Sequence, residues 1–297
     1  MLLDPRQLGA FLSVIERGSL GRAAEPLNLT QPALSRIIKR LESQLGVPLF
    51  ARLPTGMELT PYGKALLPYA KLLKTEGAQA IEEINALRGV SRGTVRVGAV
   101  ASVIAMLLPS AIEKVRKRSP GLRFQVLEAV EDNLAIALAN HEVDIAIAGN
   151  IPESEDVVRI AEHEFRDRCA IIASSAHPLQ RRRKLTIRSL LDQPWVLPPR
   201  DSPPRQQFEA LVLSLGGSLA PVAVETRSIS AIRALVARTQ FLAWLPQPLY
   251  AADEAAGLIR ALAVEGMAIE RRFFVYRRRR GFIPPAALRL LEELRHQ

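Results

Sequence analysis

Side chains that could carry out catalysis or hold a metal are few and scattered in this sequence. The four histidines show no metal-ligand spacing: His141, His163, His177 and His296. Cys169, the single cysteine, lies in an apolar run, where a thiol packs more often than it attacks. A glycine-rich phosphate loop and a Gly-x-Ser-x-Gly elbow are also missing. We therefore expect a protein that is not an enzyme and that requires no metal or cofactor.

A polar helical face near the N-terminus is the pattern most suited to binding. Leu34, Ile38 and Leu41 have helical spacing, between a preferred N-cap residue (Thr30) and a common helix terminator (Gly46). The opposite face could enter the major groove of DNA end-on, with its first turn at the base edges and its cations at phosphates. The residues expected to contact DNA on this helix are Thr30, Gln31, Pro32, Ser35, Arg36 and Lys39. By itself, a polar outer face is also ordinary for a surface helix.

The elements around this helix predict a winged helix-turn-helix over residues 1–60. A first helix is expected from the apolar spacing of Leu8 to Ile15, and Ser19 is a candidate N-cap for a second, which Pro26 should shorten or bend. Two short β-like segments follow, around a Pro-Thr-Gly turn at 54–56. Three helices and a hairpin are the parts of such a domain.

Residues 61–90 are expected to form one long linker helix, bent near Pro68. Apolar and small residues recur alternately every four and three positions: Leu66, Ala70, Leu73, Gly77, Ala80, Ile84 and Leu87. Such a seam needs a partner helix. We expect a homodimer, with Leu66, Leu73, Ala80, Ile84 and Leu87 as its contacts; the alternative is that the seam packs on the effector-binding part of the same chain.

Strands and helices alternate over residues 91–297. We expect strands at 95–100, 124–127, 143–148, 169–174, 196–197, 222–224 and 241–245, and helices at 102–118, 132–140, 187–191, 204–215 and 229–237. This predicts an α/β fold with a mainly parallel sheet in two lobes. Ligands of such folds bind where the carboxyl ends of strands meet helix N-termini.

Two polar groups follow predicted strands and are candidates for binding an anion in that cleft. Ser102 is expected to cap a helix whose free N–H groups would accept a carboxylate. The second group is Ser202-Pro203-Pro204-Arg205, whose arginine could grip a carboxylate with two hydrogen bonds. The plainer alternatives are that Ser102 is only a cap and that Arg205 is only solvated.

The net charge of +10 does not locate a DNA-binding surface, because residues 1–60 hold only seven Lys or Arg against five Asp or Glu. The basic runs at 181–184 and 277–280 are expected to be solvated. No export signal and no apolar stretch of about 20 residues, the length of a membrane helix, is present, so we expect a cytoplasmic protein.

Taken together, the chain resembles the LysR-type transcriptional regulators of bacteria. In the first part the resemblance rests on Gly18, Ser19, Ala23, Ala24, Leu27, Thr30–Arg36, Ile38, Leu41, Glu42, Leu45–Phe50, Arg52, Gly56, Leu59 and Thr60. In the second it rests more loosely on Leu108-Pro109, Ser119–Gly121, Val143–Ile147, His177–Leu179, Leu235-Val236, Leu245-Pro246 and Pro284–Ala287.

The resemblance implies a division of the chain and a mode of action. Residues 1–60 would bind DNA, 61–90 dimerise, and 91–297 bind an effector between lobe I (91–162 and 269–297) and lobe II (163–268). Arg52 and the wing tip, where Thr55 replaces the family's usual arginine, would contact the flanking DNA. Effector contacts would be Ser102, Val130, Gly149, Ser202, Pro203 and Arg205.

The partners implied are a pseudo-palindromic double-stranded DNA site, a small inducer such as an organic or aromatic acid or a sugar, and a second copy of the chain. Two dimers could pair into a homotetramer, and RNA polymerase is a possible further partner. The competing interpretation is a cytosolic solute-binding protein, or an enzyme, built on the same bilobal α/β domain; neither would explain the N-terminal winged helix.

Overall fold

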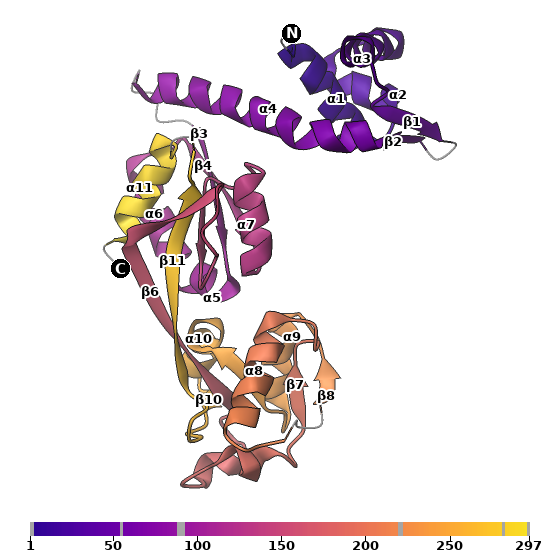
Figure 1. Cartoon of the computed structure of the whole chain (residues 1–297). Coiled ribbons are helices and arrows are strands. Elements are labelled where there is room, and N and C mark those ends of the chain that lie inside the picture. Colours follow the sequence, from indigo (N-terminus) through magenta and orange to yellow (C-terminus); the bar gives the residue numbers. More distant parts are fainter. Residues whose placement is uncertain (1–2, 54–55, 88–92, 219–221, 281–282, 296–297) are drawn as a thin grey trace.

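The computed structural model describes residues 3–53, 56–87, 93–218, 222–280 and 283–295 (Figure 1). A helical head with a small hairpin lies at one end, a long helix leads away from it, and two α/β lobes follow. Within the described residues, no helix combines the length and apolar character needed to cross a membrane.

The head is formed by three helices and a two-stranded antiparallel hairpin. Its elements are α1 (Pro5–Arg17), α2 (Leu20–Ala24), the 3-10 turn η1 (Glu25–Leu27), α3 (Gln31–Leu45), β1 (Phe50–Leu53) and β2 (Gly56–Leu59). Ser19 and Thr30 are N-caps, as predicted, and accept bonds from the N–H groups of Arg22 and Ala33. Helix α2 ends before Pro26, which confirms that the proline shortens it.

The apolar stripe of α3 forms the centre of the head. Leu34, Ile38 and Leu41 are buried with residues of α1, as the helical spacing predicts. Helix α3 ends at Gly46, whose φ of +73° is the left-handed conformation that favours glycine. Glu42 fixes the chain after α3, because its carboxylate accepts the backbone N–H groups of Leu49 and Phe50.

The linker is one helix, α4 (Pro61–Leu87), which continues through Pro68. Thr60 precedes it, accepts the N–H of Gly63 and donates to the carbonyl of Pro48. Gly63 is required there, because a Cβ at this position would lie 2.3 Å from the carbonyl oxygen of Leu49. The helix therefore starts in close contact with the head.

The two lobes share a seven-stranded sheet of order β10-β6-β11-β5-β3-β4, with β9 paired to β6. Its strands are β3 (Gly93–Ala99), β4 (Leu122–Glu128), β5 (Ile145–Ala148), β6 (Val157–Ser174), β9 (Ala243–Pro246), β10 (Ile259–Ala261) and β11 (Ile269–Arg278). In lobe I, β3 is parallel to β4 and β5, and α5 (Ala101–Met106), α6 (Leu108–Arg118), α7 (Glu131–Ala139) and α11 (Pro285–Leu294) pack on them.

Lobe II contains a small parallel sheet of β7 (Trp195–Leu197) and β8 (Val222–Glu225) beside β9 and β10. Its helices are η2 (Pro178–Arg181), η3 (Ile187–Leu190), α8 (Pro203–Ser214), α9 (Ile229–Arg238) and α10 (Gln247–Ala255). Two apolar clusters hold these elements together, one around Trp195 and one around Tyr250. The long strands β6 and β11 connect the lobes (Figure 1).

Three sequence expectations about this half are wrong. The sheet is mixed rather than mainly parallel, because β6 pairs antiparallel with β9, β10 and β11. The predicted helix 102–118 is two helices that meet at Leu107, since Pro109 cannot donate a helical hydrogen bond. The basic run 277–280 is not simply solvated, because Arg278 is 7% exposed and donates to the carbonyl of Val143.

Candidate functional site

The predicted DNA-contacting residues of α3 lie on the outside of the head. Thr30, Gln31, Pro32, Arg36 and Lys39 are exposed and Ser35 is half-buried. From Gln31 to Lys39, their side chains form no hydrogen bond or ion pair with another described residue. The helix thus presents two cations and a polar first turn that are free to meet a partner.

The hairpin lies beside this surface and is fixed to the head through glycines. The N–H of Met57 donates to the carbonyl of Gly18. Gly56 has a φ of +137°, and a Cβ at this position would lie 2.7 Å from the same carbonyl oxygen of Gly18, so only glycine fits. A small cavity of about 260 Å³ separates the hairpin from α3 and is lined by residues that include Ser35 and Lys39. Arg52 lies on β1 opposite Met57, whereas Thr55 lies outside the described residues.

The linker seam is divided between two environments. Leu66 and Ala70 pack on the core of the head of the same chain. Leu73 and Ile84, by contrast, are 49% and 58% exposed, and Ala80 is exposed as well. Nothing is described of the side chain of Leu87.

The opposite side of the linker contacts lobe I through polar groups. Lys71 Nζ lies 3.3 Å from Glu142 Oε1, and Glu76 Oε1 lies 3.3 Å from His141 Nδ1. Burial, with the nearby Arg278 guanidinium, lowers the pKa of His141 to about 4. The imidazole is therefore neutral at pH 7.

The lobe I residues predicted to contact an effector follow three adjacent strands. Ser102 follows β3, Val130 follows β4 as the N-cap of α7, and Gly149 follows β5. Because β5, β3 and β4 are parallel neighbours, these positions lie at one edge of the sheet. Val130 is 37% exposed, whereas Ser102 is buried.

Ser102 is not the N-cap that the sequence analysis expected. The cap of α5 is Val100, and the hydroxyl of Ser102 instead accepts a hydrogen bond of 2.9 Å from Arg271 Nη2. Arg271 also donates through Nε to Asp167 Oδ1 at 2.8 Å. This buried arginine–aspartate pair on β11 and β6 was missed, because its members lie far apart in sequence and within charge-rich segments.

The lobe II residues also differ from the sequence expectation. Arg205 lies in the first turn of α8, as predicted, but it is 2% exposed rather than solvated. Its Nε donates to Glu209 at 2.7 Å and its Nη1 to the carbonyl of Pro198 at 3.2 Å, so its guanidinium is already engaged. Ser202 is buried and donates to the carbonyl of Pro199, and Pro203 is exposed.

The two groups of candidate residues belong to different lobes. Helix α10 of lobe II contacts α5 of lobe I, the helix that carries Ser102 (Figure 1). No cluster of three or more potential metal ligands occurs among the residues that the structure describes. The site can therefore offer hydroxyl, guanidinium and backbone groups to a small ligand.

Two family models match the chain. Residues 5–64 match the lysR family of bacterial regulatory helix-turn-helix proteins, and residues 88–297 match the LysR substrate binding domain. The HTH-type transcriptional regulator YdcI of Escherichia coli K12, described as uncharacterized, is 31% identical over 88% of this chain and 85% of its own. CbbR of Xanthobacter flavus, also an HTH-type transcriptional regulator, is 28% identical over 98% of this chain and 87% of its own.

Solved structures agree on the fold of the whole chain. A full-length OxyR variant from Pseudomonas aeruginosa superimposes with a TM-score of 0.74 at 23% identity, covering 99% of this chain and 95% of the other. Full-length CbnR in complex with its target DNA gives a TM-score of 0.70 at 22% identity and covers 99% of both chains. The chain thus belongs to the LysR family and is a transcriptional regulator, not an enzyme.

Proposed function

We propose that the chain binds double-stranded DNA through the first turn of α3, as a homodimer joined along α4, and that a small molecule between its lobes changes this binding. The observation that carries the proposal is the division of α3. Leu34, Ile38 and Leu41 are buried, whereas Gln31 and Arg36 on the same helix are exposed. A helix anchored on one face and polar at its N-terminus can insert end-on into a major groove.

Each part of the exposed surface has a separate role in this proposal. Gln31, Pro32 and Ser35, in the first turns, would meet base edges and so carry sequence specificity. Arg36 and Lys39 would neutralise phosphates and hold the helix in register. Arg52 and Thr55 would lie near the flanking backbone, where the uncharged Thr55 would anchor the wing less strongly than an arginine.

The exposed part of α4 supports dimerisation. Five large apolar side chains on this helix are exposed: Tyr62, Tyr69, Leu73, Ile81 and Ile84. A stripe of this kind is a liability in a monomer and is typical of an interface. A two-fold pair of chains would present two copies of α3 to a pseudo-palindromic site, and two such dimers could pair into a tetramer.

The effector would act where the lobes meet. Ligand binding there would alter the contact between α10 and α5, and with it the orientation of the lobes along β6 and β11. Such a change requires that one lobe arrangement bind the ligand more tightly than the other. We favour a small organic acid, because Arg271 and Ser102 can bind a carboxylate. An oxygen of that carboxylate would replace the hydrogen bond that Arg271 now donates to Ser102.

Loss of DNA binding in a double variant of α3 would test the proposal. Ser35→Ala with Arg36→Ala should weaken binding to the DNA upstream of the neighbouring operon by about thirtyfold or more, since a base contact such as that of Ser35 contributes about 1–3 kcal/mol and the Arg36 phosphate contact is lost as well. Fluorescence anisotropy with a labelled duplex measures this. Arg181→Ala, at an exposed arginine of lobe II, serves as the control.

The thermal unfolding of the double variant should match that of the unsubstituted chain, which separates lost contacts from lost folding. An unchanged affinity in a folded double variant would contradict the role of α3. A shift caused equally by any duplex of the same length would contradict sequence-specific recognition.

The dimer contact has its own test. Leu73→Glu should shift the chain toward monomers in sedimentation equilibrium, because it places a charge in an apolar seam. Ala78→Glu, at an exposed position on another side of α4, should leave the association unchanged. If both variants associate equally well, the seam does not form the dimer interface.

A further inference from the structure

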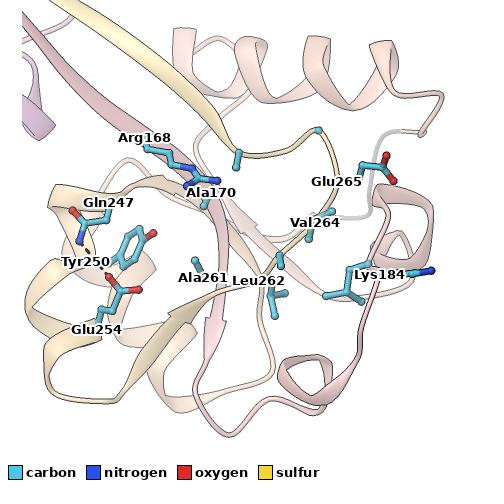
Figure 2. Close-up of a pocket in the computed structure, with 14 residues that line it drawn as sticks. Arg168, Ala170, Lys184, Gln247, Tyr250, Glu254, Ala261, Leu262, Val264 and Glu265 are labelled. Carbon is cyan, nitrogen blue, oxygen red and sulfur yellow. Dashed lines mark hydrogen bonds between the residues drawn. The ribbon is translucent and has the colours of Figure 1, made fainter.

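Lobe II contains a cavity of about 910 Å³ that no predicted site residue lines (Figure 2). It lies where the pairing of β6 passes from β10 to β11. The last β6 partner of β10 is Ile172 and the first of β11 is Cys169, so the segment 262–268 leaves the sheet between them. The floor is apolar and includes Ala170, Leu262 and Val264, and the volume is in the range of small-molecule sites.

One wall of this cavity carries the hydroxyl of Tyr250. Tyr250 of α10 is 2% exposed, and its oxygen points toward the space beneath Arg168 (Figure 2). No other described residue forms a hydrogen bond with that hydroxyl. Burial, together with Glu254, raises the pKa of Tyr250 to about 12, so the hydroxyl stays protonated at neutral pH and can donate.

The adjacent cation is also uncommitted. Arg168 on β6 lies opposite Glu270 in the strand register, but Glu270 pairs instead with Arg166 at 2.9 Å. Arg168 forms no hydrogen bond or ion pair with another described residue. The hydroxyl of Tyr250 and the guanidinium of the exposed Arg168 therefore line the same cavity.

The two carboxylates near the cavity are either bonded to another side chain or exposed. Glu254 Oε2 accepts a hydrogen bond from Gln247 Nε2, so this carboxylate already has a donor (Figure 2). Glu265 is exposed, and so is Lys184. Tyr250 and Arg168 are both donors, and together they are complementary to an acceptor such as a carboxylate.

We propose that this cavity of lobe II is a second ligand site, separate from the cleft between the lobes, that binds a small organic carboxylate with an apolar body. Tyr250 and Arg168 bind the carboxylate, and the apolar floor covers the remainder of the ligand. Because Tyr250 belongs to α10, which contacts α5 of lobe I, occupancy of this site bears on the contact between the lobes. The proposal does not depend on what binds in the cleft.

Isothermal titration of the full-length chain with phenylacetate tests the site. Phenylacetamide, a neutral molecule of the same shape, should bind about tenfold more weakly or worse, as expected for loss of a charge-assisted hydrogen bond. Tyr250→Phe and Arg168→Gln should each weaken phenylacetate binding by a similar factor. These substitutions keep most of the side-chain volume, so the cavity should persist.

A matched variant locates the binding. Arg181→Gln in lobe II repeats the same chemistry at an exposed position and should leave the affinity unchanged. Unchanged affinity in both Tyr250→Phe and Arg168→Gln would overturn the proposal, as would tighter binding of phenethylamine or no binding of millimolar phenylacetate.

Discussion

The head and the two lobes are stabilised by different kinds of buried group. In the head, the buried polar side chains among the described residues are Gln7 and Ser13, neither of which is charged. The lobes bury several charges: Asp144, Asp167, Arg205, Arg278 and Glu293. The head is therefore held by apolar packing and helix caps, whereas the lobes also depend on paired charges, which are costly to leave without a partner.

The same difference applies to the surfaces that would meet ligands. Gln31 and Arg36 on the head need not break any contact described within the chain before they meet DNA. Ser102 and Arg205 in the lobes are bonded within the chain, so a ligand there must replace an existing partner. Exchange of partners is one physical route by which binding can select a different lobe arrangement.

The largest effect should follow removal of a partner from the buried pair between β6 and β11. Arg271→Met leaves the Asp167 carboxylate, which is fully buried, without its counter-charge. We expect unfolding of the lobes to become easier by about 3–5 kcal/mol in urea. Arg272→Met, at the exposed neighbouring position, should cost little; equal losses in both variants would argue against a special role for the pair.

In the head, the corresponding loss of stability should come from a close contact with the backbone. Gly63→Ala would place a Cβ 2.3 Å from the carbonyl oxygen of Leu49, and backbone cannot move aside as a long side chain can. We expect the head to lose about 1–3 kcal/mol of stability. Gly9→Ala on α1 meets nothing within 4 Å and should instead stabilise by up to about 1 kcal/mol.

If exposed cations of the head contact phosphates, each of them should contribute to the salt dependence of DNA affinity. Arg36→Gln should reduce the slope of log affinity against log salt by about 0.9, the contribution of one phosphate contact. Binding titrations at several salt concentrations measure this slope. Arg181→Gln should leave it unchanged, and an equal slope in the Arg36 variant would show that this residue contacts no phosphate.

The smallest effect concerns pH and the contact between the linker and lobe I. The pKa of His141 is lowered to about 4 in the folded chain and would be near 6.5 when unfolded, so the unfolded chain binds more protons between these values. Stability should therefore fall as the pH drops from about 6.5 toward 4. His141→Asn, which tolerates the local φ of +59°, should make this decline shallower.

Thermal unfolding at a series of pH values compares the two proteins. Their curves should run in parallel above pH 7, where the imidazole is neutral in both folded and unfolded chains. Parallel curves below pH 6 as well would show that His141 does not contribute to the acid sensitivity.

The sequence predicted the head well because its signals are local. Thr30 and Gly46 delimit α3 with bonds to residues only a few positions away, and the period of Leu34, Ile38 and Leu41 identifies its buried face. Strand β6 was predicted only over its last residues, 169–174, and β11 was not predicted. Their segments place charges beside apolar residues, so the hydrophobic pattern that marks a strand is weak.

The candidate effector residues show the limit of such patterns. The sequence placed Arg205 in the first turn of a helix, but its burial depends on Glu209, Glu225 and the carbonyl of Pro198. Ser102 was expected to cap α5, yet its partner is Arg271, 169 positions along the chain. Contacts between such distant positions leave no periodic trace in a single sequence.

The sequence alone determined the winged head, the long linker helix, the two-lobed α/β domain and membership in a family of regulators, because caps, heptad spacing and strand–helix alternation act over short distances. Only the tertiary structure decided which polar groups remain free for a ligand. That choice depends on which charges meet across strands and lobes, and burial makes those pairs obligatory wherever they form.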